Sequence, residues 1–137
     1  AVPATPPAHD ASHRGTETIL LVDDFARLRE KMAESLRHLG YEVLQAGTGE
    51  EALRLWGAHR SRIGLLFTDI SLPGGMNGFE IADALCASAP SLRVIFSSGY
   101  GDEMMDERRQ ADGMVFLPKP CDLGVMARTI RECFDKV

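Results

Sequence analysis

Residues 64–69 read Gly-Leu-Leu-Phe-Thr-Asp, a short apolar run that ends on the carboxylate of Asp69. Two further apolar runs also lead to charged residues: residues 19–22 precede Asp23 and Asp24, and residues 114–117 lead through Pro118 to Lys119. Short apolar runs bounded by turn residues are typical of buried parallel strands. Because ligands bind outside the carboxyl ends of the strands in an open α/β sheet, we expect these charged side chains to converge on one site.

The rest of the chain alternates between strand-like and helix-like patterns. We predict strands over residues 18–22, 42–46, 64–69, 93–97 and 114–117. Helices are expected over residues 25–39, after Thr48, over residues 79–88 and 102–111, and after Asp122. Five strands that alternate with five helices predict a doubly wound α/β domain with a mainly parallel sheet.

Apolar side chains recur every three or four residues in the expected helices, as they do on a core-facing stripe. The stripes are Phe25, Leu28, Met32, Leu36 and Leu39, then Ala52, Leu55 and Trp56, and finally Met126, Ile130, Cys133, Phe134 and Val137. Trp56 is therefore expected in the core rather than against a ligand.

Local signals mark several helix ends. Gly40 is expected to close the first helix, and Asp122 to cap the last one. Thr48 is followed three residues later by Glu51, which fits a capping box at the start of the second helix.

Composition bounds the class of protein. The chain has 137 residues, 45% hydrophobic and 26% charged, with a formal net charge of -5. The acidic balance argues against nucleic acid or an anionic membrane as the main partner, and no apolar stretch is long enough to cross a bilayer. We predict a disordered tail or linker over residues 1–16 and one domain over residues 17–137. The three cysteines lack metal-ligand spacing and indicate a reducing, cytoplasmic location.

The acidic residues indicate a divalent metal site. Asp24 by itself could simply favour a helix N-terminus. A further carboxylate, Asp69, at the end of another buried run changes this interpretation, because crowded like charges raise one another's proton affinity unless a cation neutralises them. Hard oxygen ligands suit Mg²⁺.

Lys119 and Ser98 add what a phosphoryl group would need at such a site. The ammonium can hold an anionic oxygen, and the hydroxyl just beyond the fourth strand can donate a hydrogen bond. With the charge on the phosphoryl oxygens neutralised, the free carboxylate of Asp69 can attack in line and form an aspartyl phosphate.

Four motifs in the chain match those of a known protein family: ILLVDD at residues 19–24, FTDISLPGGMNGFE at 67–80, VIFSSGY at 94–100 and FLPKP at 116–120. In this order and spacing they resemble the CheY-like receiver domain of two-component response regulators, over residues 17–137. The resemblance implies a flavodoxin-like (βα)₅ sandwich with a five-stranded parallel sheet in the order 2-1-3-4-5, which places the first and third strands at the topological switch point.

The resemblance also implies a role for each matching residue. Asp69 matches the phosphoacceptor, Asp24 a direct Mg²⁺ ligand, and Asp23 a neighbour that acts through water. The backbone carbonyl of Ser71 would complete the protein ligands to the metal. Lys119 matches the lysine that contacts the phosphoryl group, and the peptide bond that follows it is often cis in this family.

Two positions match the family's switch. Ser98 corresponds to the hydroxyl that turns toward the phosphoryl group, with Ser97 as the rival because a one-residue slip reverses the faces of a strand. Phe116 corresponds to the aromatic residue that swings inward, although ordinary packing in the strand is the simpler interpretation from sequence alone. The switching face would be built from the family's fourth helix, fifth strand and fifth helix.

The implied partners are a histidine kinase or a histidine phosphotransfer protein, and the family also allows a homodimer that forms on phosphorylation. The loop after Asp69 is one residue longer than the commonest pattern, and Gly99 replaces a common alanine; the long loop and the FSSGY run resemble receivers of hybrid sensor histidine kinases. Two alternatives stay open. One is a degenerate receiver that serves as a protein-binding scaffold. The other is a Mg²⁺-dependent phosphohydrolase of the haloacid-dehalogenase type, which would want an aspartate where Ser71 stands.

Overall fold

The computed structural model describes residues 13–99 and 107–135 and forms one five-stranded parallel sheet. The strands are β1 (Thr18–Val22), β2 (Glu42–Ala46), β3 (Ile63–Asp69), β4 (Arg93–Ser98) and β5 (Val115–Pro118). The helices are α2 (Ala26–His38), α3 (Gly49–His59), α4 (Gly78–Ser88), α5 (Glu107–Ala111) and α6 (Leu123–Asp135). The strand order β2-β1-β3-β4-β5 confirms the predicted doubly wound topology.

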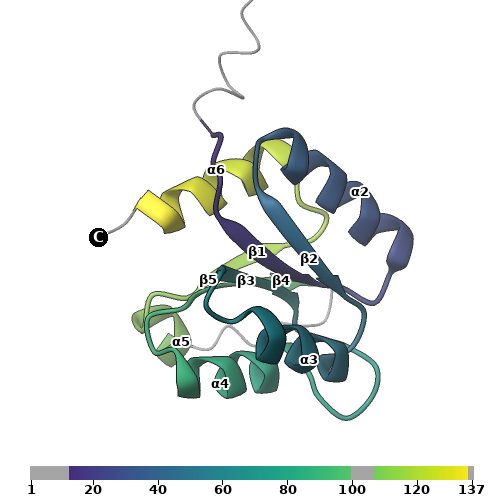
Figure 1. Ribbon diagram of the computed structural model, residues 1–137, viewed down its shortest axis with the longest axis vertical. Helices are drawn as coiled ribbons and strands as arrows, with labels where there is room; N and C mark the ends of the chain where they lie inside the picture. The colour runs from purple at the N-terminus through teal and green to yellow at the C-terminus, as the bar shows by residue number, and fades with distance from the viewer. Residues whose placement is uncertain (1–12, 100–106, 136–137) are drawn as a thin grey trace, which may run out of the picture.

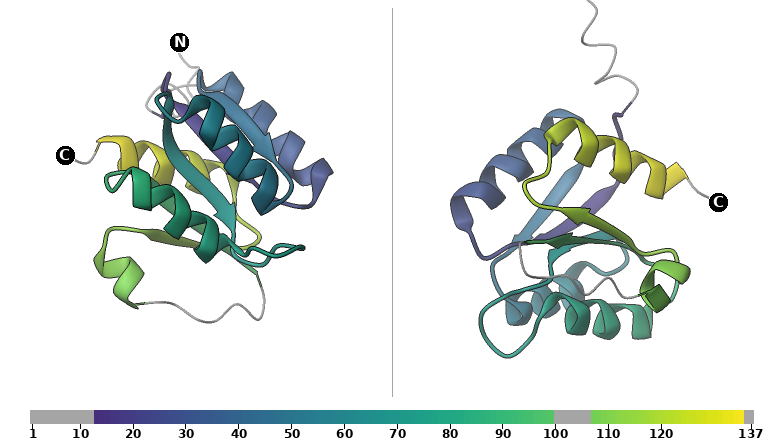
Figure 2. Two further views of the ribbon diagram at one scale, coloured as in Figure 1. Left: turned by 60° about the horizontal axis from the view of Figure 1, so that its bottom comes forward. Right: turned by 180° about the vertical axis from the view of Figure 1, so that it is seen from behind.

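The helices cover both faces of the sheet. Helices α2 and α6 lie on one face, and α3, α4 and α5 lie on the other (Figure 1). The same three layers are visible in the two further views (Figure 2). Each face has its own core cluster, one around Leu21, Phe67 and Ile95 and the other around Leu20 and Phe96. Since both faces are buried, the central strands read as continuous apolar runs rather than as alternating ones.

Helix boundaries follow the expected local signals in most places. Gly40 has φ +104°, a conformation that L side chains rarely adopt, and directly follows the C-cap residue of α2. The Thr48 hydroxyl accepts a hydrogen bond of 3.1 Å from the Glu51 N–H. The Glu51 carboxylate accepts instead from the N–H of Gly47, at 2.6 Å, so the expected capping box is only half formed. Trp56 is buried, and its indole N–H donates to the Ser88 hydroxyl.

The structure has one complete capping box that the sequence analysis did not predict, at the start of α4. The Asn77 side chain accepts from the Glu80 N–H at 2.9 Å, and the Glu80 carboxylate accepts from the Asn77 N–H at 2.9 Å. The Asn-x-x-Glu spacing was readable from the sequence, and it starts α4 directly after the loop that leaves the acidic site.

Several predicted details were wrong or incomplete. Phe25 and Leu28, assigned to the apolar stripe of the first helix, are 62% and 38% exposed, and Phe25 precedes α2 as its N-cap. The fourth strand runs to Ser98 and the fifth from Val115 to Pro118, because backbone pairing between β4 and β5 continues beyond the apolar residues. Of the helix expected over residues 102–111, only Glu107–Ala111 lies in the described residues, and Val137 lies outside them.

Residues 13–17 contact the end of the domain opposite the strand carboxyl ends. The guanidinium of Arg131 in α6 donates to the Glu17 carboxylate, to the Tyr41 hydroxyl and to the backbone carbonyl of Arg14. The Gly15 N–H donates to the Leu39 carbonyl at 3.1 Å. Residues 1–12 of the expected tail lie outside the described residues, so the boundary at residue 17 stays a prediction. None of the helices in the described ranges is both long and apolar enough to span a membrane.

Candidate functional site

Three carboxylates meet at the carboxyl ends of β1 and β3, as expected from the strand ends. One oxygen from each of Asp23, Asp24 and Asp69 lies within 4.8 Å of the others. Asp23 and Asp69 are buried, whereas Asp24 is exposed. Because β1 and β3 are hydrogen-bonded neighbours at the switch point of the sheet, two segments some 45 residues apart in sequence deliver their acidic ends to one place.

Lys119 faces this cluster from the end of β5. Its Nζ lies 2.7 Å from Asp69 Oδ1 and 3.8 Å from Asp23 Oδ2. The peptide bond between Lys119 and Pro120 is cis, as the resemblance implied. The Lys119 N–H donates to the Ser98 carbonyl at 2.8 Å, which fixes the backbone of the lysine beside the end of β4.

The electrostatics of the cluster favour a proton or another cation. Burial raises the pKa of Asp69 to about 6, and the charges of Asp23 and Asp24 also raise it, although Lys119 opposes the shift. For Lys119 burial alone would lower the pKa, but the hydrogen bond and charge of Asp69 together with the charges of Asp23 and Asp24 outweigh burial and raise the pKa. One ammonium therefore does not balance the three carboxylates.

The loop after β1 is held by contacts that sequence reasoning missed. Asp23 Oδ1 accepts a hydrogen bond of 2.9 Å from the Phe25 N–H. Arg29, one turn into α2, donates from Nη1 to the Asp23 carbonyl at 2.7 Å and from Nε to the Gln45 side chain at 3.1 Å. These contacts orient Asp23 and Asp24 toward β3, but no sequence motif marks Arg29 because its acceptors come from the backbone and from another strand.

Gly78 lets the loop after Asp69 return against its own start. A Cβ at residue 78 would lie 2.1 Å from the Asp69 carbonyl oxygen and 2.9 Å from the Ile70 Cα. The Gly78 N–H donates to the Ile70 carbonyl at 2.8 Å, so the close approach is also a hydrogen-bonded one. Glycine is required here by space, next to the residue that carries the buried carboxylate.

Gly78→Ala is expected to destabilise the domain by about 1–3 kcal/mol, because the added methyl group would meet fixed backbone atoms. Gly57→Ala is the matched control. Gly57 lies exposed in α3 with nothing within 4 Å of an added Cβ, so alanine should stabilise the helix by about 0.5–1 kcal/mol. Urea denaturation of both variants measures the difference, and equal effects would contradict the steric role of Gly78.

The residues present fit a divalent metal ion. Two buried carboxylates and one exposed carboxylate supply hard oxygen donors, and the exposed Asp24 leaves a side open for water or substrate ligands, which Mg²⁺ retains. The raised pKa of Asp69 indicates the same need for positive charge. Ser71 lies exposed two residues after Asp69, in the loop that borders the cluster.

Asp69→Asn is expected to raise the free energy of unfolding at pH 7 by about 1–3 kcal/mol when no divalent ion is present. The pKa of about 6 in the folded protein lies above the ordinary value of 3.8, so ionised Asp69 destabilises the fold at neutral pH. This cost disappears as the pH falls toward the ordinary value, and the gain in the variant should be less than about half as large at pH 4.5. Urea denaturation of the variant and the wild type at both pH values measures the difference in the free energy of unfolding. A difference that does not change with pH would contradict the crowding of charges around Asp69.

The two candidate switch serines lie on opposite faces of β4. Alternation along the strand places Ser97 on the same face as Ile95, toward α2 and α6, and Ser98 on the same face as Phe96, toward α3 and α4. Ser97 is the register partner of Asp69, and Ser98 is the partner of Pro118. Phe116 shares the face of Ser98 and packs on Phe96 with ring centroids 5.1 Å apart.

The family model of the response regulator receiver domain matches residues 19–131, which include the acidic cluster and Lys119. The chain belongs to this family. Receiver domains are signalling domains rather than enzymes in the ordinary sense, and they interact with histidine kinases or phosphotransfer proteins.

Individual relatives agree with this assignment. The receiver domain is 32% identical over 123 residues to the sensor kinase CckA of Brucella abortus, covering 89% of this chain and 13% of that protein. It is 29% identical to the sporulation initiation phosphotransferase F of Bacillus subtilis, covering 85% of this chain and 92% of that protein. The solved structure of the response regulator TrrA of Thermotoga maritima with Mg²⁺ and BeF is 26% identical with a TM-score of 0.74, covering 85% and 98% of the two chains.

Proposed function

We propose that this receiver domain accepts a phosphoryl group on Asp69 from a phosphohistidine of a histidine kinase or phosphotransfer protein. The observation that carries the proposal is the buried carboxylate of Asp69, which lies 2.7 Å from the Lys119 ammonium and within 4.8 Å of two further carboxylates. A scaffold that only binds proteins has no need to bury this unbalanced charge, because burial of a charge is costly unless it is used or neutralised.

In the proposed reaction a carboxylate oxygen of Asp69 attacks the phosphorus of the phosphohistidine in line. The new O–P bond forms as the N–P bond breaks, and the electron pair of that bond returns to the imidazole ring, which takes up a proton. Lys119 holds one phosphoryl oxygen as a fixed positive charge. Asp24, Asp69 and the Ser71 carbonyl would hold a Mg²⁺ ion, with Asp23 acting through water.

When bound, Mg²⁺ would supply the positive charge that neutralises the carboxylates and the phosphoryl oxygens. The TrrA structure is a complex with Mg²⁺ and BeF, and this likeness supports the same requirement here. Hydrolysis of the aspartyl phosphate would use the same residues, with water as the nucleophile, so that the domain resets itself without a separate enzyme.

Phosphorylation is proposed to act through Ser98 and Phe116. Both lie on the α3/α4 face of the sheet, where Phe116 contacts Phe96 and lies 6.2 Å from the ring of Phe79. A hydroxyl drawn toward the phosphoryl group would make room on this face and bias the packing of Phe116 between two states. In the labels of Figure 1, the switching face consists of α5, β5 and α6.

Exposed apolar side chains beside the acidic site support a protein as the phosphoryl donor. Phe25, Leu28 and Leu123 are the large hydrophobic residues exposed within the described ranges. Phe25 and Leu28 lie at the start of α2, which follows the end of β1, whereas Leu123 at the start of α6 lines the cleft that also contains Ser35 and Leu39 of α2. A partner that presents its phosphohistidine to Asp69 would cover the exposed apolar side chains of Phe25 and Leu28 at the start of α2.

The proposal is tested by intact mass spectrometry of the protein after incubation with acetyl phosphate, with Mg²⁺ and with EDTA. One added phosphoryl group is expected with Mg²⁺ only, and borohydride trapping followed by peptide mapping should locate it at Asp69. If no group is added and the protein also fails to bind beryllofluoride, the scaffold interpretation takes its place.

Ser98→Ala is expected to weaken the conformational response without abolishing phosphoryl uptake, whereas Ser97→Ala should leave the response intact. Loss of one hydrogen bond of about 1 kcal/mol corresponds to about a fivefold change in the two-state equilibrium. The measurement is the change in the NMR signals of the Phe116 ring on addition of beryllofluoride and Mg²⁺. The opposite result, a response lost only in Ser97→Ala, would make Ser97 the switch hydroxyl.

The wider setting is also part of the proposal. A cytoplasmic location agrees with the three free cysteines, and attachment to a hybrid histidine kinase agrees with the likeness to the receiver domain of the hybrid histidine kinase CckA. Because the chain spans only 13% of CckA, the activity of that whole kinase is not transferred to this domain. A homodimer that forms on phosphorylation stays a prediction, and size-exclusion chromatography with beryllofluoride would detect it.

A further inference from the structure

A cavity of about 380 Å³ lies beside the acidic site, on the side of the sheet covered by α2 and α6. Met32, Phe67 and Met126 form its apolar wall, and Asp23, Ser97 and Lys119 lie at its polar end. Leu28 and the exposed Pro120 also line it, so the cavity opens to solvent at the start of α2. Its volume is within the range of about 300–1,000 Å³ found for small-molecule sites.

Ser97 is the feature that points to a ligand. The residue is only 6% exposed, yet its hydroxyl makes no hydrogen bond to any residue within the described ranges. Its oxygen is not sealed in the protein, because every fully enclosed side-chain polar atom there has a partner. The hydroxyl therefore reaches the cavity. No protein group within the described ranges pairs with this hydroxyl, so a polar group of a ligand in the cavity would take over the hydrogen bond that water can form there.

The charges around the cavity decide which ligand fits. Three carboxylates face one ammonium, and Lys119 already lies 2.7 Å from Asp69, so without a bound metal ion an anionic ligand would be repelled. The carboxylates would favour a cation at the polar end, but a charged group among Met32, Phe67 and Met126 would have no partner and would be costly to bury. What remains is a neutral molecule with one hydrogen-bonding group at the Ser97 end and an apolar body among the methionines.

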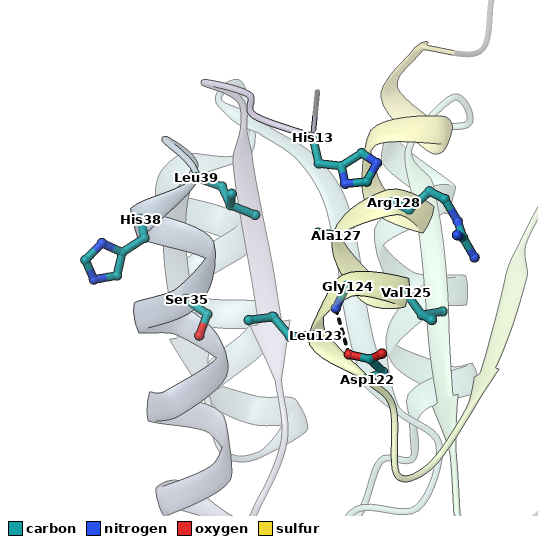
Figure 3. A pocket seen from close by; sticks show the side chains of 10 residues that line it. All are labelled: His13, Ser35, His38, Leu39, Asp122, Leu123, Gly124, Val125, Ala127 and Arg128. Carbon is teal, nitrogen blue, oxygen red and sulfur yellow. Dashed lines mark hydrogen bonds between the residues drawn. The ribbon is translucent and has the colours of Figure 1, made fainter. Parts of the chain in front are cut away.

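A larger cleft of about 640 Å³ lies between α2 and α6, but its polar side chains do not point to a ligand in the same way (Figure 3). There the Asp122 carboxylate already accepts a hydrogen bond of 3.0 Å from the Gly124 N–H, and the His38 ring points away from the cleft (Figure 3). The smaller cavity has instead the hydroxyl of Ser97, a residue that is only 6% exposed and whose hydroxyl has no protein partner within the described ranges.

We propose that the cavity beside Lys119 is a binding site for a neutral amphipathic small molecule, such as a phenol or a short alcohol. Its hydroxyl group pairs with Ser97, and its apolar body packs between Met32, Phe67 and Met126. Binding requires no phosphoryl group and no metal, so this proposal can be tested independently of the phosphorylation of Asp69.

The test is a titration of the full chain with phenol, and separately with toluene, followed by NMR of ¹³C-labelled methionine methyl groups. The chain has six methionines, of which Met32 and Met126 line the cavity while Met76 and Met114 pack in the other core cluster. Phenol is expected to shift the methyl signals of Met32 and Met126 saturably and to leave those of Met76 and Met114 in place. Toluene, which lacks the hydroxyl, should bind about fivefold more weakly.

Ser97→Ala should remove the advantage of phenol over toluene, and Ser98→Ala, on the opposite face of β4, should retain it. Unchanged signals of Met76 and Met114 in the free variants show that they are folded. The site is refuted if the Met32 and Met126 signals do not move, if all four assigned methyl groups shift without saturation, or if phenol keeps its advantage in Ser97→Ala.

Discussion

Asp69→Asn is expected to lower the rate of phosphoryl uptake from acetyl phosphate by more than about 10³-fold, the scale of effect seen when a nucleophile is removed. The amide keeps the shape of the side chain but has no carboxylate oxygen to attack phosphorus. Lys119 and the carboxylates of Asp23 and Asp24 stay in place around it. The measurement is the initial rate of mass increase with saturating Mg²⁺.

Two companion variants separate the nucleophile from its surroundings. Asp112→Asn changes an exposed acid outside the acidic cluster and should react within about twofold of the wild type, since surface substitutions of this kind have small effects. Asp24→Asn keeps the nucleophile but loses a metal donor, so it should need at least about tenfold more Mg²⁺. Uptake at a normal rate by Asp69→Asn would move the phosphoacceptor to another residue.

Phe96→Ala is expected to destabilise the domain by about 3–5 kcal/mol, the usual cost of removing a buried aromatic ring. Phe96 is fully buried in β4 and contacts the ring of Phe79 edge to face at 4.9 Å and that of Phe116 at 5.1 Å. Alanine would leave a cavity in the centre of the α3/α4 side of the sheet. The measurement is the free energy of unfolding in urea.

Phe25→Ala is the matched control for this loss. The same atoms are removed, but Phe25 is 62% exposed at the start of α2, and the stability should change by less than about 0.5 kcal/mol. Its effect is expected instead in transfer from a phosphorylated protein partner, while uptake from acetyl phosphate stays normal. Equal losses of stability in the two variants would contradict the described packing.

Much of the site could be predicted because its residues are tied to strand ends. An apolar run in the sequence marks a strand, and the parallel arrangement then brings the carboxyl ends of neighbouring strands together, which is why Asp23, Asp69 and Lys119 meet as expected. The sequence alone did not decide which face of the sheet each of Ser97 and Ser98 occupies, because a one-residue slip in register exchanges the two faces. The core clusters around Ile95 and Phe96 assign them, because alternation along β4 can be read once its neighbours are known.

The sequence by itself therefore determined the order of strands and helices, the acidic and basic ends of the strands, and the stop at Gly40. These features depend on neighbours in the chain, on the period of apolar residues and on backbone preferences at single positions. Only the tertiary structure decided the exposure of Phe25, the hydrogen bond from Arg29 to the Asp23 carbonyl, and the close approach of Gly78 to the backbone of Asp69. It also decided the pKa of Asp69 and the open hydroxyl of Ser97, because desolvation and pairing depend on atoms that other elements bring from far along the chain.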